Sequence, residues 1–87
     1  MRTIHKYPIE ITDFQTLKVP QERRILSVQV QNDKPCIWME VKTDTPHTEL
    51  KVYVFGTGQP MPPIDLHYIG TIQVLEGRGV FHVYWAW

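Results

Sequence analysis

The sequence predicts an all-β protein: a small antiparallel β-sandwich or open barrel of six to seven strands, formed as a single domain over residues 1–87. Three observations support this. Apolar residues recur at every second position in several short runs, which is the period of a half-buried strand. Turn-forming Gly, Pro, Asn and Asp residues separate these runs. A proline-rich stretch in the second half forbids helix. A globule of this length has a radius of gyration of roughly 12 Å, so a second domain has no room.

The first two runs lie at the N-terminus. Residues 3–11 alternate well enough for a strand, but Pro8 cannot donate to a ladder and therefore predicts an edge strand. Residues 13–20 form the second run, which ends at a proline; a short helical turn over residues 12–16 is the alternative. A polar turn over residues 21–24 follows.

The cleanest alternation predicts a β-hairpin in the middle of the chain. Its arms are residues 25–31 and 36–41, and the turn-forming residues 32–35 join them. Trp38 falls on the outer face if the aliphatic face is core. The predicted core-facing side chains are Leu26, Val28 and Val30 on the first arm and Ile37, Met39 and Val41 on the second.

A polar loop over residues 42–49 leads to the next strand, residues 50–55. This strand is apolar on both faces, which predicts a place in the sheet interior or aromatic side chains at an interface. It ends at Gly-Thr-Gly, residues 56–58. The prolines that follow predict that residues 59–65 form a stiff, ordered crossover.

A second hairpin is predicted at the C-terminus. Residues 66–75 and 80–85 are its arms and residues 76–79 its turn. Gly70 interrupts the first arm, which indicates a bulge or the close approach of another backbone or of a ligand.

Composition limits the class of protein. Nine basic residues balance nine acidic ones, so the basic excess typical of nucleic-acid-binding proteins is missing and we do not expect such a partner. No apolar run approaches the roughly 20 residues that cross a bilayer, so no membrane association is expected. The single cysteine, Cys36, cannot form an internal disulfide, and no secretory leader pattern is present, which favours a cytoplasmic setting. A domain this small has a thin margin of stability, which favours a homo-oligomer.

No pattern indicates catalysis, a metal ion or a cofactor. Ser27 is the only serine and lies mid-strand, and Cys36 has no cysteine at metal-ligand spacing. The carboxylates are scattered, so no pair suits acid–base work. We therefore expect no enzyme. The four histidines, none at ligand spacing, are His5, His47, His67 and His82.

The Gly-Thr-Gly stretch, residues 56–58, invites a phosphate-binding hypothesis because glycine loops bring backbone N–H groups close to an anion. No Gly-Lys-Ser/Thr follows, and the prolines exclude the helix that completes such a site. A strand-end turn with positive φ angles at its glycines is the favoured interpretation.

Aromatic residues supply the other candidates, because Trp and Tyr are enriched at protein interfaces and as stacking platforms. Core and interface roles remain open for most of them; we favour the interface for Trp38 and for residues 85–87. His82 is predicted to be a hydrogen-bonded strand histidine or a contact residue. The candidate ligand- or partner-binding residues are Arg23, Arg24, Trp38, Tyr53, Thr57, Gly58, Tyr68 and His82.

Motifs along nearly the whole chain resemble a family of short uncharacterised proteins encoded in tailed-phage genomes. These motifs are Lys6-Tyr7-Pro8, Ile25-Leu26-Ser27-Val28-Gln29 with Trp38, Gly56-Thr57-Gly58, Tyr68-Ile69-Gly70-Thr71 and His82-Val83.

The resemblance implies an early or accessory phage protein that acts in the host cytoplasm. By analogy, we expect non-catalytic binding that inhibits a host defence factor. In one version Trp38 and Tyr53 mask a host protein. In the other, Arg23 or Arg24, aromatic stacking and backbone amides around Thr57 sequester a small nucleotide signal. A minor structural protein of the virion is the alternative.

Overall fold

The computed structural model describes all 87 residues and confirms the all-β prediction. No helix long and apolar enough to cross a membrane is present. The seven strands are β1 (Arg2–Pro8), β2 (Phe14–Pro20), β3 (Arg23–Gln31), β4 (Lys34–Lys42), β5 (His47–Gly56), β6 (His67–Val74) and β7 (Gly79–Ala86).

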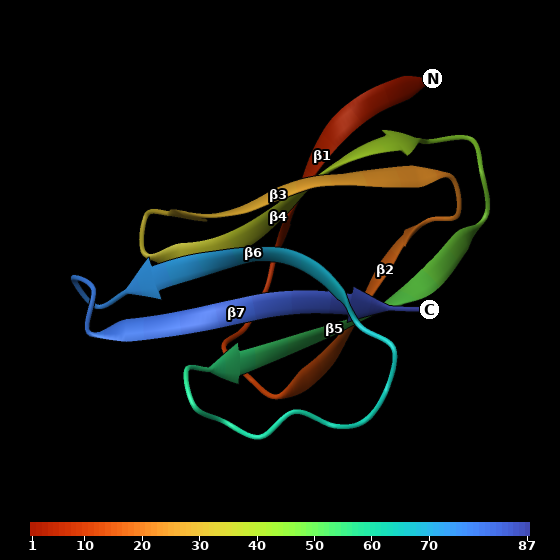
Figure 1. The fold of residues 1–87 in the computed structure, drawn as a ribbon. Helices are drawn as coiled ribbons and strands as arrows, with labels where there is room; N and C mark the ends of the chain where they lie inside the picture. Colours follow the sequence, from red (N-terminus) through yellow and green to blue (C-terminus); the bar gives the residue numbers. More distant parts are fainter.

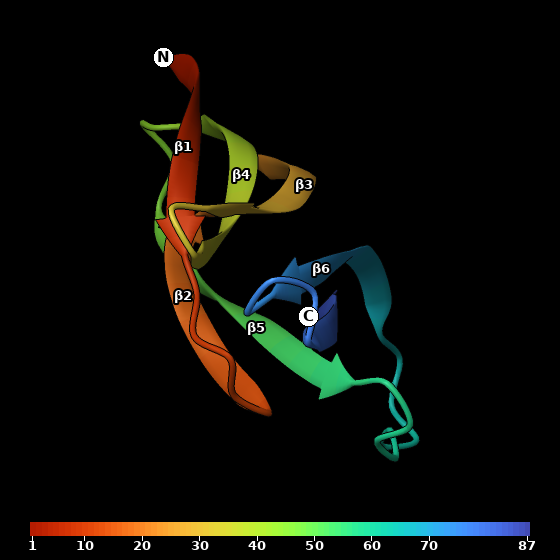
Figure 2. The same cartoon turned by 90° about the vertical axis from the view of Figure 1, so that its left-hand side faces the viewer.

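The strands form two antiparallel sheets that face each other as a small sandwich. One sheet has three strands in the order β1-β4-β3, and the other has four in the order β2-β5-β7-β6 (Figure 1). β1 lies at a sheet edge, as its proline predicted, and β5 lies in a sheet interior, as its two apolar faces predicted. Figure 2 shows the sheets from the side.

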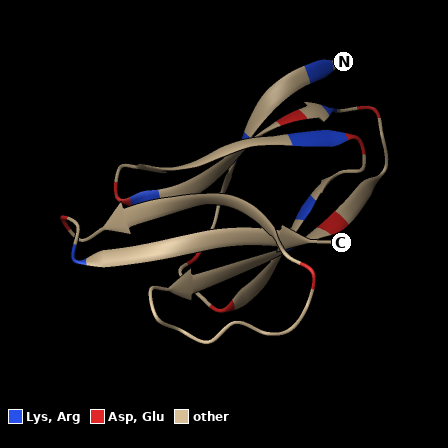
Figure 3. Cartoon of the chain, in the orientation of Figure 1, with Lys and Arg blue, Asp and Glu red and all other residues tan.

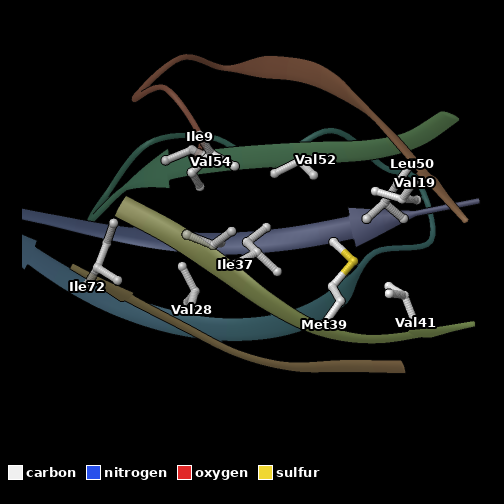
Figure 4. Packing of buried hydrophobic residues seen from close by; sticks show 11 residues of the cluster. Ile9, Val19, Val28, Ile37, Met39, Val41, Leu50, Val52, Val54 and Ile72 are labelled. Carbon is white, nitrogen blue, oxygen red and sulfur yellow. The ribbon is translucent and has the colours of Figure 1, made fainter. Parts of the chain in front are cut away.

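The core lies between the sheets and uses one face of each. The aliphatic residues of β4 and β5 dominate it, and Figure 4 shows them gathered between the ribbons. The predicted inward faces of these two strands are therefore confirmed. Their buried residues are Ile37, Met39, Val41, Leu50, Val52 and Val54.

β3 and β6 pack against each other across the two sheets, and Gly70 of β6 lies against Val28 of β3. A Cβ atom at Gly70 would lie 2.8 Å from Cγ1 of Val28, closer than real side chains approach. The β6–β7 register also shifts between Tyr68 and Gly70. The bulge, one of the two alternatives predicted for this glycine, is confirmed; the group that approaches it closely is the Val28 side chain and not another backbone.

Two predictions about β3 are wrong. Arg23 and Arg24 belong to the strand and not to the preceding turn. The register with β4 shifts between Ile25 and Ser27, so Leu26 is a bulge residue that is 40 % exposed. Ile25 packs against the core in its place, because the extra residue moves the alternation by one position.

The bounds of several turns and loops differ from the predicted ones. The alternative of a helical turn over residues 12–16 is wrong, because β2 begins at Phe14 and pairs with β5. The polar loop shrinks to residues 43–46 between β4 and β5, and the β6–β7 turn occupies residues 75–78. The β3–β4 turn is a two-residue loop, Asn32 and Asp33, with φ angles of 50° and 62°. These angles fit a type I′ turn. The predicted turn over residues 32–35 is two residues too long, because Lys34 and Pro35 pair within β4.

Charged residues avoid one half of the four-stranded sheet. β6 and β7 contain no Lys, Arg, Asp or Glu, and Figure 3 shows both ribbons without charge colouring. The edge strand β1 instead carries Arg2 and Lys6, and charges on an edge strand discourage pairing with another sheet.

Candidate binding surface

An aromatic row crosses the outer face of the four-stranded sheet, with one residue on each strand. Directly paired residues in antiparallel strands lie on the same face, and Val52 and Val54 on either side of Tyr53 are buried inward. The row therefore faces outward. Its members, in the order of the strands, are Phe14, Tyr53, Tyr84 and Tyr68.

Ring contacts join the aromatic row into one cluster. The ring centroids of Phe14 and Tyr53 are 5.0 Å apart, and those of Tyr68 and Tyr84 are 5.3 Å apart. Phe55 fills the space beside Tyr84, with a centroid distance of 5.7 Å, and is 4 % exposed. The two ends of the row are open: Phe14 is 48 % exposed and Tyr68 is 58 % exposed.

A chain of hydrogen bonds runs beside the row and ends at Tyr68. Thr57 Oγ1 is 2.8 Å from His82 Nε2, and His82 Nδ1 is 3.0 Å from Thr71 Oγ1. The hydroxyl of Thr71 is in turn hydrogen-bonded to the hydroxyl of Tyr68. Both ring nitrogens of His82 are thereby occupied, so these hydrogen bonds hold the His82 and Tyr68 side chains in place. His82 is a hydrogen-bonded strand histidine, as predicted.

The Gly-Thr-Gly stretch forms a turn at the end of β5. The amide of Gln59 donates to the carbonyl of Gly56 over 3.0 Å, and Gly58 has a φ of 89°, which fits a type II turn. Positive φ was predicted for both glycines; it is confirmed at Gly58 and wrong at Gly56. The Gln59 side chain braces the turn by accepting from the Gly56 amide at 3.0 Å and donating to Asp13 Oδ1 at 3.2 Å.

A small hollow of about 260 Å³ lies between this turn and the outer face of the sheet. The crossover that follows contains no helix and connects β5 to β6, as predicted, and its Met61 forms part of the wall. None of the lining side chains carries a permanent charge. The lining residues are Phe55, Gly56, Thr57, Gly58, Gln59, Met61, His82 and Tyr84. The aromatic row and Met61, which is 49 % exposed, are called the apolar surface below.

Trp38 lies on the other sheet. It is half-buried on the outer face of β4, where its paired neighbours are Lys6 and Ser27. Lys6 Nζ donates to Gln31 Oε1 over 2.6 Å, which ties β1 to β3 across β4. Trp38 therefore does not share a face with the aromatic row.

The two arginines point in opposite directions. Arg23 pairs with the buried Val41 and so faces inward, whereas Arg24 pairs with Glu40 on the outer face. Adjacent residues in a strand point to opposite faces, but at this end of the sandwich both arginines line one hollow of about 360 Å³, together with Gln21, Ile25, Trp85 and Trp87.

Arg23 closes one end of the sandwich. Its Nη1 donates to the carbonyls of Pro20, at 3.3 Å, and Gln21, at 3.2 Å, and its guanidinium lies 5.9 Å from the ring centroid of Trp87. Partial burial lowers the pKa of the Arg23 guanidinium. Trp85, for which an interface was predicted, is partly buried against the core, and the His67 ring stacks on it with a centroid distance of 4.4 Å.

The structure thus gathers five of the eight predicted binding residues on one face and separates the other three. Tyr53, Thr57, Gly58, Tyr68 and His82 lie on or beside the apolar surface, and Arg23, Arg24 and Trp38 do not. Sequence reasoning counted Tyr84 among the aromatic residues whose role, core or interface, was open, and it missed Phe14 and Thr71 as members of this site. Only the pairing of β2 with β5 and of β7 with β6 brings them there. The chain brings together no group of three or more His, Cys, Asp or Glu residues that could hold a metal ion.

Over residues 1–87, the chain matches the model of a family described as Domain of unknown function (DUF7352) and therefore belongs to that family. No curated protein and no solved structure matches the chain.

Proposed function

We propose that this member of the DUF7352 family is a non-catalytic phage accessory protein that binds a host defence factor in the host cytoplasm and inhibits it by masking. The phage assignment rests on the motifs given above, from Lys6-Tyr7-Pro8 to His82-Val83. The observation that carries the binding role is the aromatic row. Tyrosine is enriched in interface hot spots because it offers a large rigid ring together with a hydroxyl.

The geometry favours masking over nucleotide sequestration. Arg23 lies near the start of β5, since Gln21 beside it bonds to Pro46, whereas Thr57 follows the end of β5. A ten-residue strand spans about 30 Å, so one nucleotide cannot contact both residues of the same chain. A surface that crosses four strands suits a protein partner better.

Affinity capture from host lysate with quantitative mass spectrometry tests this proposal. The wild-type chain should enrich a specific partner that Phe14→Ala and Tyr68→Ala lose. Trp38→Ala is the matched control, because it removes an aromatic ring from the outer face of the other sheet. Loss of the partner with Trp38→Ala alone would move the binding surface to the wrong sheet and defeat the proposal.

Inhibition needs its own readout. A phage that encodes the chain should plate efficiently on a host that carries the target defence. The same phage with Tyr68→Ala should plate poorly there and normally on a host without the defence. Equal plating of both phages on both hosts contradicts an anti-defence role.

Sequestration of a nucleotide is a second candidate, and the hollow favours it. The amides of Thr57 and Gly58 take part in none of the turn and loop hydrogen bonds, and both residues are exposed, so both amides are free to bind a ligand. A thermal-shift screen with cyclic and linear nucleotides tests this, since a hundredfold excess over Kd stabilises a protein by about 2.7 kcal/mol. A flat screen rejects the nucleotides tried.

The alternative of a minor virion protein predicts the chain in purified particles, which mass spectrometry would detect.

A further inference from the structure

The hollow of about 360 Å³ at one end of the sandwich joins charged and aromatic side chains from both sheets. It lies between the start of β3 and the end of β7 (Figure 1). Arg23 and Arg24 line it from β3, and Trp85 and Trp87 line it from the end of β7, so it is called the Arg–Trp hollow below. Ligand sites generally measure roughly 300–1,000 Å³, so this volume suits a small ligand.

The side chains that line the Arg–Trp hollow include two guanidinium groups and no carboxylate. Neither arginine takes part in an ion pair of the chain. Glu40, the paired neighbour of Arg24 in β4, forms its ion pair with Arg2 instead, at 3.9 Å. An anionic ligand therefore complements the hollow.

The two guanidinium groups favour a phosphate as that anion. Arg23 uses its Nη1 to hold the carbonyls of Pro20 and Gln21, which leaves its Nε and Nη2 for a ligand. Arg24 is exposed, so its guanidinium can turn towards the same ligand. Each planar guanidinium matches two oxygens of a phosphate or carboxylate. A phosphate monoester carries a charge of about −1.5 to −2, which suits two arginines better than a single carboxylate does.

The two indoles offer a surface to a planar ring. His67 stacks on Trp85, and Trp87 meets Trp85 edge-on with a centroid distance of 5.0 Å, so Trp85 is held by both neighbours. Trp87 is 77 % exposed, and the Arg23 guanidinium lies 5.9 Å from its ring centroid. A base stacked on Trp87 therefore brings a phosphate attached to it within reach of Arg23.

We propose that the Arg–Trp hollow binds a nucleoside monophosphate, with the phosphate on Arg23 and Arg24 and the base on Trp87. The other hollows fit this ligand less well. The larger hollow beside it, of about 700 Å³, has charges of both signs and no aromatic ring, and the hollow at the Gly-Thr-Gly turn has no Lys or Arg.

The Arg–Trp hollow lies at the opposite end of β5 from the Gly-Thr-Gly turn. One ligand there reaches both a charge and a ring, which no nucleotide spanning Arg23 and Thr57 can do. A nucleotide in this hollow also leaves the apolar surface free, so this inference is independent of the proposed masking.

Isothermal titration calorimetry with adenosine, guanosine, cytidine and uridine 5′-monophosphates tests the proposal. At least one nucleotide should bind one to one with a Kd below about 1 mM. The matching nucleoside and inorganic phosphate should each bind at least about tenfold more weakly, because each keeps only one of the two kinds of contact.

Two substitutions locate the site. Arg24→Ala and Trp87→Ala should each weaken nucleotide binding by at least about tenfold. Both side chains are exposed, so both variants should fold, which circular dichroism checks. Arg78→Ala and Tyr68→Ala are the matched controls, because they remove an exposed guanidinium from the β6–β7 turn and an exposed ring from the apolar surface.

Three results overturn the proposal. The first is that none of the four nucleotides binds at millimolar concentration. The second is an affinity that either Arg24→Ala or Trp87→Ala leaves unchanged in a folded variant. The third is a nucleoside or inorganic phosphate that binds as tightly as the nucleotide, because the phosphate or the base would then contribute nothing. Masking fails separately, since partner capture depends on Phe14 and Tyr68 and not on Arg24.

Discussion

Gly70 shows how the absence of one side chain lets strands of the two sheets pack closely. No torsion requires a glycine here, since its φ is not positive; the requirement is space, because Val28 of β3 occupies the position that a side chain would need. Overpacking of this kind typically costs about 1–3 kcal/mol. Gly70→Ala should therefore lower the free energy of unfolding by about that amount, measured by urea denaturation. The double variant Gly70→Ala/Val28→Ala should lose less free energy of unfolding than the sum of the two single variants, because the smaller residue at position 28 makes room for the new methyl group. Additive losses would show that the two residues do not compete for the same space.

Tyr7 gives the chain a dependence on alkaline pH. Its ring packs against the core from β1, and burial raises the pKa of its phenol above the usual value of 10.0. The folded state therefore resists ionisation more than the unfolded state does. The stability from this difference is fully present below pH 10 and is lost as the pH rises through the pKa of the folded state. Urea denaturation from pH 8 upwards should show the wild type losing stability relative to Tyr7→Phe above about pH 10. Parallel curves for the two proteins would contradict the assignment.

At the scale of elements, the bulge in β3 distinguishes two strand leucines, Leu26 and Leu50, that regular alternation places on inward faces. Leu50 is fully buried in β5, and Leu26 is 40 % exposed at the bulge. Leu50→Ala should lower the free energy of unfolding by about 2–5 kcal/mol through lost packing and a residual cavity. Leu26→Ala should change it by less than about 1 kcal/mol. Chemical denaturation of both variants checks this. A large loss at Leu26 would mean that regular alternation, and not the bulge, describes β3.

The same element shows where sequence reasoning succeeds and where it ends. Alternation placed Val28, Ile37 and Val52 in the core because local period alone decides which face a side chain joins in a regular strand. The bulge at Leu26 broke that period and no local residue signalled it. The aromatic row could not be predicted from local sequence patterns at all. Phe14 and Tyr84 belong to one site only because the sheet order is β2-β5-β7-β6, and the crossover that skips over β7 sets that order.

At the scale of the whole molecule, neither sheet can persist without the other, because the core is built from one face of each and each sheet alone would expose that face to water. Single domains of this size generally unfold in one step. Two natural probes report on the two sheets: Trp38 on β4 and Trp85 on β7. Two variants each keep a single tryptophan. Trp85→Phe/Trp87→Phe keeps Trp38, and Trp38→Phe/Trp87→Phe keeps Trp85. In each variant, the urea midpoint from fluorescence should coincide with the midpoint from circular dichroism, because loss of one sheet removes the support of the other. A fluorescence transition that comes earlier for Trp38 would show the three-stranded sheet opening first, and the contact of Val28 with Gly70 would then be too weak to couple the sheets.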